Sequence, residues 1–375
     1  MRRTLAALLI FSLFLAAGCG TVQEYSGPEF SDPWAGLSSE EASAPPAVSE
    51  TPKSAGAEYV STGTLNPLTG QSNLPSYMAR TRPVSVLINN YVKALPQNGI
   101  TAADLVIEAE AEGGITRLLA FYSDWRSAPV IGSIREARLH FLDLAQSFDS
   151  IMVYMGANQE TKDAAKARGY KTLDAAYYSD KELTYRDEEL KKTRAAEHTV
   201  MTNGEMLTKV ISSSKMRTAL GDDYPQTCFK FAAGGELVIP PAFRARAVYL
   251  PVGLNAEYHF DETTGLYMRS LAGAAQTDLN NGEQVGVTNV LVLFAKQYAN
   301  PNDATMVTID INAGEGYYFS MCGGRKIYWQ KGVGETDRIT LYDEKGNELT
   351  LNQGRTWINI ISTTLADRVT WTQIG

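Results

Sequence analysis

Residues 82–125 read RPVSVLINNYVKALPQNGITAADLVIEAEAEGGITRLLAFYSDW, and this stretch decides the fold class. Its first and last parts, residues 83–89 and 115–122, are short apolar runs that predict strands. Between them, residues 106–112 alternate charged and apolar side chains. Working outward, one more strand is expected at 150–155, and helices are expected at 133–148, 159–168 and 202–212. Because strands and helices interleave, we expect an α/β layered domain over residues 81–228.

The pattern changes in the second half of the chain, residues 229–375. Short apolar runs that fit strands occur at 247–250, 256–260, 266–270, 287–296, 305–311, 316–321, 326–330, 338–342 and 356–361. Two connecting sequences, DETTG at 261–265 and DEKG at 343–346, end in a glycine that supplies a positive φ for a hairpin loop. We therefore expect a β-rich C-terminal domain, a sandwich or a partly closed barrel, and an α+β protein as a whole.

Composition excludes several classes of protein. The chain has 375 residues with 34 Lys+Arg and 42 Asp+Glu, so its formal net charge is −8. An acidic balance argues against a general nucleic-acid binder, because neutralising phosphates requires clustered Lys and Arg. Three cysteines and three histidines leave little for a zinc site, which usually needs four N or S ligands. We expect no metal, no cofactor and no nucleic-acid partner.

The N-terminus predicts the location of the protein. Arg2 and Arg3 precede a short apolar run, which is typical of a signal peptide over residues 1–18. The sequence LAAG before Cys19 resembles a bacterial lipobox, in which the cysteine is acylated and becomes the new N-terminus. Several acyl chains on one residue give stable membrane attachment. We expect a lipoprotein anchored through Cys19 on the extracytoplasmic side of the cell membrane; the alternative is a plain secretory signal with an incidental cysteine.

Residues 19–80 are expected to be a flexible acidic tether. The segment is rich in Ser, Pro, Ala, Gly and Glu, and Lys53 is the only basic residue between positions 20 and 79. Such a composition cannot bury enough apolar surface to offset the entropy of ordering. Three aromatic residues, Tyr25, Phe30 and Trp34, leave an ordered arm as the alternative.

Two arginines mark the most informative candidate site. Ser133 and Glu136 have the spacing of a capping box, which predicts that a helix begins there. Arg135 then falls in the first turn, where the helix macrodipole disfavours a cation, and Arg138 points along the buried side. Two guanidinium groups at the start of a helix predict a bound or neighbouring anion, since guanidinium groups bind carboxylate or phosphate bidentately.

The anion has two possible sources. Glu108, Glu110 and Glu112 share one face if residues 106–112 form a strand. If these residues form a helix, Glu108 and Glu112 still share a face at i, i+4; in either case Arg117 follows shortly after. One interpretation is a structural network in which these carboxylates pair with the arginines, because buried charges must be paired. The other is a polar cleft that binds a ligand with anionic or hydroxyl groups, such as a glycan. Both interpretations can hold together.

The three histidines offer one candidate acid or base. His198 is that candidate, although a single histidine is more often a hydrogen-bonded structural residue. His140, within the expected helix, and His259, in an expected hairpin, are interpreted as structural. The chain contains no H-E-x-x-H, G-x-S-x-G, Walker A, C-x-x-C or dinucleotide-binding glycine motif.

Two further features leave alternatives open. Cys228 and Cys322 have the option of pairing in an oxidising exterior. Trp329, Lys331 and Trp357 either line a sugar-stacking surface or, for the tryptophans, pack in the core.

Several motifs, in this order, resemble the YerB-like family of bacterial lipoproteins. They are the strand ending at Asn90, PQNG at 96–99, EGGITR at 112–117, GSIREAR at 132–138, YRD at 185–187, EHT at 197–199 and LNQGRTWI at 351–358. Glu197 and Thr199 stand where that family has Pro and Asn around the histidine. The resemblance implies a lipid-anchored, two-domain extracytoplasmic protein, and it implies no established catalytic mechanism.

We therefore expect a binding or scaffold module of the cell envelope rather than an enzyme, with an envelope glycan or envelope protein as partner. The candidate ligand-binding residues are Asn90, Gln97, Glu108, Glu112, Arg117, Arg135, Arg138 and His198. One alternative is a cell-wall-modifying enzyme in which Glu108 and Glu112 act as acid and base. Another is a solute-binding receptor with an enclosed pocket between two domains.

Overall fold

The computed structural model describes residues 63–372. The expected signal peptide, Cys19 and the tether up to residue 62 lie outside the described residues. The last part of that tether, 63–80, is packed: Leu68 is fully buried, and a backbone bridge joins Thr64 to Leu74. The packed structure thus begins earlier in the chain than the boundary expected at residue 81. No helix among residues 63–372 has the length and apolar character needed to cross a bilayer.

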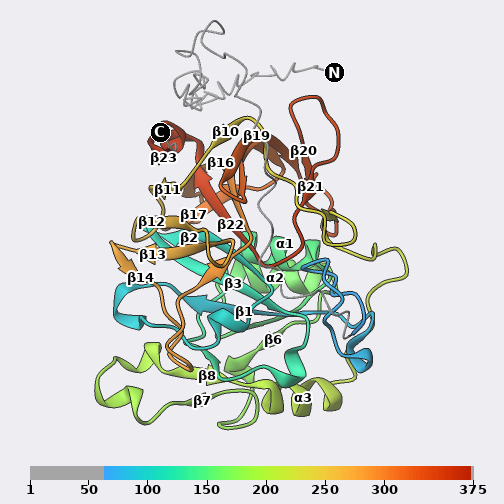
Figure 1. The fold of residues 1–375 in the computed structure, drawn as a ribbon. Helices are drawn as coiled ribbons and strands as arrows, with labels where there is room; N and C mark the ends of the chain where they lie inside the picture. Colours follow the sequence, from blue (N-terminus) through green and yellow to red (C-terminus); the bar gives the residue numbers. More distant parts are fainter. Residues whose placement is uncertain (1–62, 373–375) are drawn as a thin grey trace, which may run out of the picture. The chain divides into compact units, whose positions relative to one another are not determined.

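One long mixed sheet runs through both halves of the sequence (Figure 1). From the first half it takes β1 (Val84–Asn89), β2 (Leu105–Glu112), β3 (Ile115–Tyr122), β5 (Ile151–Tyr154) and β6 (Leu173–Asp174). From the second half it takes β10 (Phe243–Arg244), β16 (Asn289–Asn300), β17 (Asp303–Asp310), β18 (Ala313–Ser320), β19 (Gly323–Gln330), β20 (Thr340–Tyr342) and β22 (Thr356–Ser362). The seam is the parallel pair β2–β22, with Leu105 opposite Thr356. The boundary expected near Cys228 stays a prediction, and the sheet continues across it.

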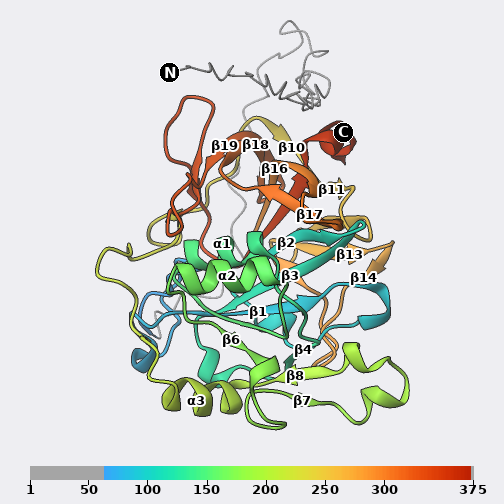
Figure 2. The ribbon, with the colours of Figure 1, turned by 180° about the vertical axis from the view of Figure 1, so that it is seen from behind.

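Two helices cover one face of this sheet, α1 (Leu139–Ser147) and α2 (Gln159–Ala167), which lie side by side in Figure 2. Strand β2 alternates, so that Leu105, Ile107, Ala109 and Ala111 join the apolar core that also contains Phe141 of α1. The core therefore forms where a period-2 strand pattern meets the apolar stripe of a helix.

The opposite face is covered by a second, antiparallel sheet. It consists of β11 (Ala247–Leu250), β12 (Ala256–Asp261), β13 (Leu266–Leu271), β14 (Ala274–Ala275), β15 (Gly286–Val287) and β23 (Thr370–Thr372). The two sheets meet where Tyr258 of β12 donates to Asn359 of β22. The described strands form packed sheets and no closed barrel. The predicted fold class, an N-terminal α/β layered part followed by a β-rich part, is confirmed.

The remaining elements are small. One is the helix α3 (Gly204–Ser213). Two small sheets consist of β4 (Ile131–Gly132), β7 (Tyr185–Arg186) and β8 (Val200–Thr202), and of the pair β9 (Lys230–Phe231) and β21 (Thr350–Leu351). The 3-10 turns are η1 (Ser76–Met78), η2 (Val92–Ala94), η3 (Ile100–Ala102), η4 (Trp125–Ser127), η5 (Ala175–Tyr177), η6 (Leu190–Lys192), η7 (Ala196–His198) and η8 (Thr363–Arg368). Among them, α3 packs on η4.

The predicted start of the helix at Ser133 is wrong. Helix α1 begins at Leu139, and residues 133–138 are extended, with Arg138 at the N-cap. The reason is tertiary: the backbone N–H of Ile134 donates to Val200, that of Arg135 to Leu87 and that of Ala137 to Gly156. Backbone hydrogen bonds to three different segments outweigh a single local capping box.

Candidate functional site

Five buried side chains form a closed ring of hydrogen bonds on the β-rich side of the long sheet. Asn90 donates to Glu108 (2.9 Å), Gln97 donates to Asn90 (2.9 Å), and Gln276 donates to Gln97 (3.0 Å). Arg269 closes the ring by donating to both Gln276 and Glu108. Each of the five residues is at most 4% exposed. We call this set, Asn90, Gln97, Glu108, Arg269 and Gln276, the buried ring.

The buried ring is the polar joint between the two halves of the chain. Glu108 lies on β2, whereas Arg269 lies on β13 and stacks over the Trp357 ring at 4.2 Å. Nearby, Asp278 accepts from the backbone N–H groups of Gly99 and Thr101, which fixes the PQNG turn against the second half. Three predicted site residues, Asn90, Gln97 and Glu108, are thus committed to internal contacts and have no path to solvent.

The opposite face of the sheet carries a different charged group. The Arg117 guanidinium contacts Glu112 at 2.6 Å and Glu136 at 3.1 Å. Arg138 also pairs with Glu112, and Arg135 pairs with Glu136 at 3.0 Å. We call these residues, Arg117, Arg135, Arg138, Glu112 and Glu136, the arginine cluster. The two outermost carboxylates are the accessible ones, since the Glu112 side chain is 29% exposed and the Glu136 side chain 41%.

The expectation that Glu108 and Glu112 share a face is wrong. Glu108 accepts from Thr116 at 2.7 Å, whereas Glu112 pairs with Arg117, and consecutive residues of β3 point to opposite faces. The cause is a β-bulge: the pairing of β2 with β3 shifts register between Glu110 and Glu112, so Glu112 turns to the helix-covered face. The predicted single site is therefore divided between two faces of one sheet.

The arginine cluster holds one more positive than negative charge. Burial lowers the pKa of Arg117 to about 10, which leaves it charged at neutral pH. Burial opposes ionisation of Glu136, but the guanidinium groups of Arg117 and Arg135 outweigh it and lower the pKa of that carboxyl. The Glu136 carboxylate is therefore ionised, and with three guanidinium groups against two carboxyl groups the cluster favours a further anion.

His198 lies at the margin of the arginine cluster. Its Nδ1 is 2.8 Å from the amide of Asn89, and its side chain is 5% exposed. Because the Asn89 amide nitrogen can only donate, Nδ1 accepts and the proton sits on Nε2. Burial lowers the pKa of His198, and although Glu197 raises it, Arg135 lowers it further, so the ring is neutral at pH 7. The geometry gives His198 a hydrogen-bonding role beside Arg135.

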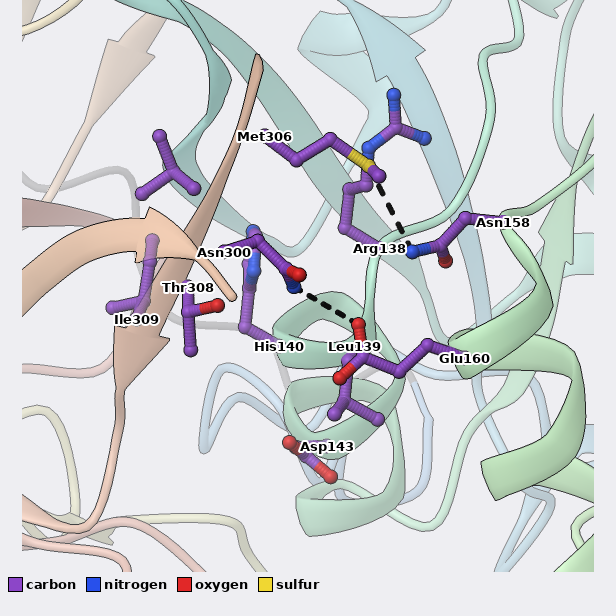
Figure 3. Close-up of a pocket in the computed structure, with 11 residues that line it drawn as sticks. Arg138, Leu139, His140, Asp143, Asn158, Glu160, Asn300, Met306, Thr308 and Ile309 are labelled. Atoms are coloured by element: carbon purple, nitrogen blue, oxygen red, sulfur yellow. Dashed lines mark hydrogen bonds between the residues drawn. The ribbon is translucent and has the colours of Figure 1, made fainter. Parts of the chain in front are cut away.

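A cavity of about 40 Å³ adjoins the arginine cluster at Arg138 (Figure 3). Its walls come from the starts of α1 and α2 and from β17, including His140, Asn158 and Thr308. His140 was expected to be structural, and sequence reasoning did not place it near a cavity. Burial lowers its pKa to about 3, helped by Arg117 and Arg138.

The remaining sequence candidates are structural. Cys228 and Cys322 are both free thiols, and burial raises the pKa of each. Trp329, Lys331 and Trp357 are between 1% and 6% exposed, so they form no sugar-stacking surface. His259 lies on β12 beside Glu257.

Comparison with known proteins places the chain in a family. Residues 68–217 match the "Protein of unknown function (DUF3048) N-terminal domain", and residues 247–358 match the corresponding C-terminal domain. The "Putative lipoprotein YerB" of Bacillus subtilis (strain 168) is 30% identical over 307 residues, which is 79% of this chain and 85% of that protein. The chain belongs to the YerB-like family.

The crystal structure of YerB protein from Bacillus subtilis matches this fold with a TM-score of 0.69 at 25% identity. The match covers 82% of this chain and 99% of that chain. The predicted resemblance to the YerB-like family is thus confirmed. A lipoprotein of unknown function is the description that the relative supports.

Sequence reasoning missed two members of the buried ring, Arg269 and Gln276, and one carboxylate of the arginine cluster, Glu136. Arg269 lies in the strand LYMRSL, where alternation places it on the same face as Tyr267, a fully buried residue. A lone arginine on the apolar face of a strand was the available signal, because a buried guanidinium needs a buried carboxylate. Glu136 was interpreted only as half of a capping box.

Proposed function

We propose that this protein is a membrane-anchored, extracytoplasmic lipoprotein of the cell envelope that binds an anionic ligand through the arginine cluster. The lipobox-like sequence before Cys19 and the name of the Bacillus subtilis relative support the anchor. The observation that carries the binding role is the convergence of three guanidinium groups on two carboxylates, next to partly exposed side chains. An envelope glycan bearing carboxylate or phosphate groups has the matching chemistry.

The geometry disfavours the alternative in which Glu108 and Glu112 act as acid and base. Glu108 is fully buried and paired with Arg269, so it has no route to a substrate. Glu112 lies on the other face, held by Arg117 and Arg138. A glycosidase needs two carboxyl groups that flank one bond, about 5–10 Å apart across an open cleft. These two carboxylates flank a sheet instead.

A solute receptor that closes about a hinge also fits poorly. The described residues, 63–372, lie in one compact unit, and strands β2 and β22 pair directly across the two halves. The buried ring occupies the place where an inter-domain pocket would lie. The two halves therefore act as a single rigid support for the arginine cluster.

The test is a binding assay on the full chain purified in detergent. We expect a carboxylate- or phosphate-bearing envelope polysaccharide to bind and an uncharged polysaccharide of similar length not to bind. The variant Arg135→Gln should weaken binding about tenfold, because one partly exposed cation is lost from the cluster. Arg246→Gln is the control, since Arg246 is 56% exposed and, among residues 63–372, forms its ion pair with the exposed Glu262.

Two results would contradict the proposal. One is equal binding of charged and uncharged polysaccharides, unaffected by Arg135→Gln. The other is release of polysaccharide fragments that disappears in a Glu112→Gln variant, which would favour an enzyme.

A further inference from the structure

The cavity beside Arg138 contains three buried polar atoms that have no partner among the described residues: Arg138 Nε, His140 Nε2 and Thr308 Oγ1. His140 is only 4% exposed, and the neighbouring lining residues, Asn158 and Met306 among them, are half-buried. Figure 3 shows Arg138 and His140 rising from the start of α1, with Thr308 and Met306 of β17 facing them. Buried polar atoms normally have partners, so this arrangement points to a group that enters from outside.

The donor and acceptor pattern of these atoms can be assigned. A hydrogen bond between the His140 ring and the Glu110 backbone raises the pKa of the ring, as a ring N–H that donates to a carbonyl does. Because Nε2 has no partner among the described residues, we infer that Nδ1 is the donor and carries the proton of the neutral ring. His140 Nε2 is therefore an acceptor, Arg138 Nε is a donor, and the Thr308 hydroxyl does either. A hydroxyl group matches this set in kind, because a hydroxyl donates one hydrogen bond, as Nε2 requires, and accepts others, as an N–H donor requires. A carboxylate or phosphate oxygen alone does not, since it has no proton for Nε2.

Two helix N-termini and Arg138 contribute positive potential at this place, against the carboxyl groups of Asp143 and Glu160, which also line the cavity. Ala137 and Ala157 form a parallel bridge just before α1 and α2, so both helices start on the same side. Each N-terminus carries a partial positive charge of roughly half an electron and presents free backbone N–H groups. The cavity and the arginine cluster are continuous through Arg138, which pairs with Glu112 on one side and lines the cavity on the other.

We propose that the ligand of the arginine cluster is a hydroxylated anion, whose charged group lies at Arg135 and Arg138 and whose neighbouring hydroxyl enters the cavity at His140 and Thr308. Sugar carboxylates and polyol phosphates share this chemistry. This inference rests on the proposed function and adds the class of ligand. A cavity of about 40 Å³ admits a hydroxyl and its carbon, since one water needs about 10–15 Å³.

The experiment compares small probes that differ only in hydroxylation, using the full chain in detergent. D-glucuronate is compared with tetrahydropyran-2-carboxylate, and glycerol 1-phosphate with propyl phosphate, which separates carboxylate from phosphate ligands. Methyl glucoside is the uncharged probe. We expect the hydroxylated member of at least one pair to bind at least tenfold more tightly than its deoxygenated partner.

Two variants locate the effect. Thr308→Val keeps the shape of the side chain and should reduce the preference for the hydroxylated probe about fivefold, and His140→Leu should remove it. Thr340→Val on β20 and His259→Leu on β12 are the matched controls. Because the chain has three histidines, ¹⁵N-histidine labelling gives a second measurement: the Nε2 resonance of His140 should shift with the hydroxylated probe alone.

The outcomes separate the two proposals. Equal binding within both pairs, or a preference that survives Thr308→Val and His140→Leu, overturns the hydroxyl inference and leaves anion binding intact. Failure of every charged probe to bind overturns the proposed function, and the inference falls with it. Methyl glucoside binding as tightly as glucuronate contradicts the role of the arginine cluster.

Discussion

Glu108→Gln is expected to destabilise the protein strongly, although it is a conservative substitution. It removes the counter-charge of Arg269 while keeping the size of the side chain, and both side chains are 0% exposed. Breaking a buried ion pair from one side costs about 3–5 kcal/mol, because the remaining charge has neither a partner nor water. Arg269 keeps its contacts with Tyr258, Gln276 and the Trp357 ring, which favours the lower half of that range.

The loss is measurable by urea unfolding followed by tryptophan fluorescence. In thermal unfolding of a folded part of roughly 300 residues, a loss of about 3 kcal/mol of unfolding free energy should lower Tm by roughly 5 °C. This follows from an unfolding entropy of about 2 cal/mol/K per residue. Glu262→Gln, which removes an exposed pair with Arg246, is the control and should change stability by less than about 0.5 kcal/mol. The double variant Glu108→Gln with Arg269→Met should recover part of the loss, since the unpaired charge is then gone.

The reasoning would be refuted if Glu108→Gln alone lowered the free energy of unfolding by less than about 1 kcal/mol. Such a small loss would mean that Arg269 is hydrated in the folded protein. A second measurement checks the separation of the two faces. The folded Glu108→Gln protein should bind an anionic polysaccharide as the parent does, because Glu108 lies on the face opposite the arginine cluster.

Three further predictions concern other parts of the chain. Cys19→Ala should move the protein from the membrane fraction to the soluble fraction of fractionated cells, and retention in the membrane would count against a lipid anchor. The folded pKa of His140, about 3, lies below its unfolded value of 6.5, so the neutral ring contributes fully above about pH 6.5 and the contribution is lost as the pH falls toward 3. Between pH 6.5 and pH 3, the free energy of unfolding of the parent protein should fall by about 1.4 kcal/mol per pH unit relative to that of His140→Leu. Parallel plots of unfolding free energy against pH for the two proteins would exclude a buried neutral ring. Cys228 and Cys322 should both be alkylated in denaturant without reductant, with Cys228 protected in the folded state by burial; an intact mass that shows no alkylation would indicate a disulfide.

Local patterns were sufficient for most strands. The expected strands at 83–89, 115–122, 247–250 and 356–361 coincide with β1, β3, β11 and β22 to within a residue. Strand period, β-branched side chains and turn glycines are properties of neighbouring residues, so they can be recognised without knowing the fold.

The prediction of where α1 begins was wrong because contacts with distant residues determine the start of this helix. Ser133 and Glu136 have good local capping chemistry, but the backbone of residues 133–137 bonds to residues 87, 89, 155, 156 and 200, all far away in the sequence. A capping box stabilises by about a kilocalorie per mole, and several backbone hydrogen bonds to other segments exceed it.

The sequence identified most residues of the candidate site, but not how these residues are arranged in space. Sequence reasoning selected Arg117, Arg135, Arg138 and Glu112, and the structure brings these four together. It also grouped them with Glu108, because an unbroken strand would put Glu108 and Glu112 on one face. A single extra residue in β2 reverses that face, and such a bulge has no local signature in LVIEAEAE.

By itself, the sequence determined the fold class, the secreted-lipoprotein signature and the residue types of the charged cluster, since these depend on composition and on short-range period. Which charged side chains pair with one another depends on the tertiary structure. Arg269 reaches Glu108 across 161 positions of sequence, and Thr308 reaches the cavity of His140 from a distant hairpin. Coulomb energy and burial depend on distances in space, and these distances exist only after the two sheets and the helices have packed.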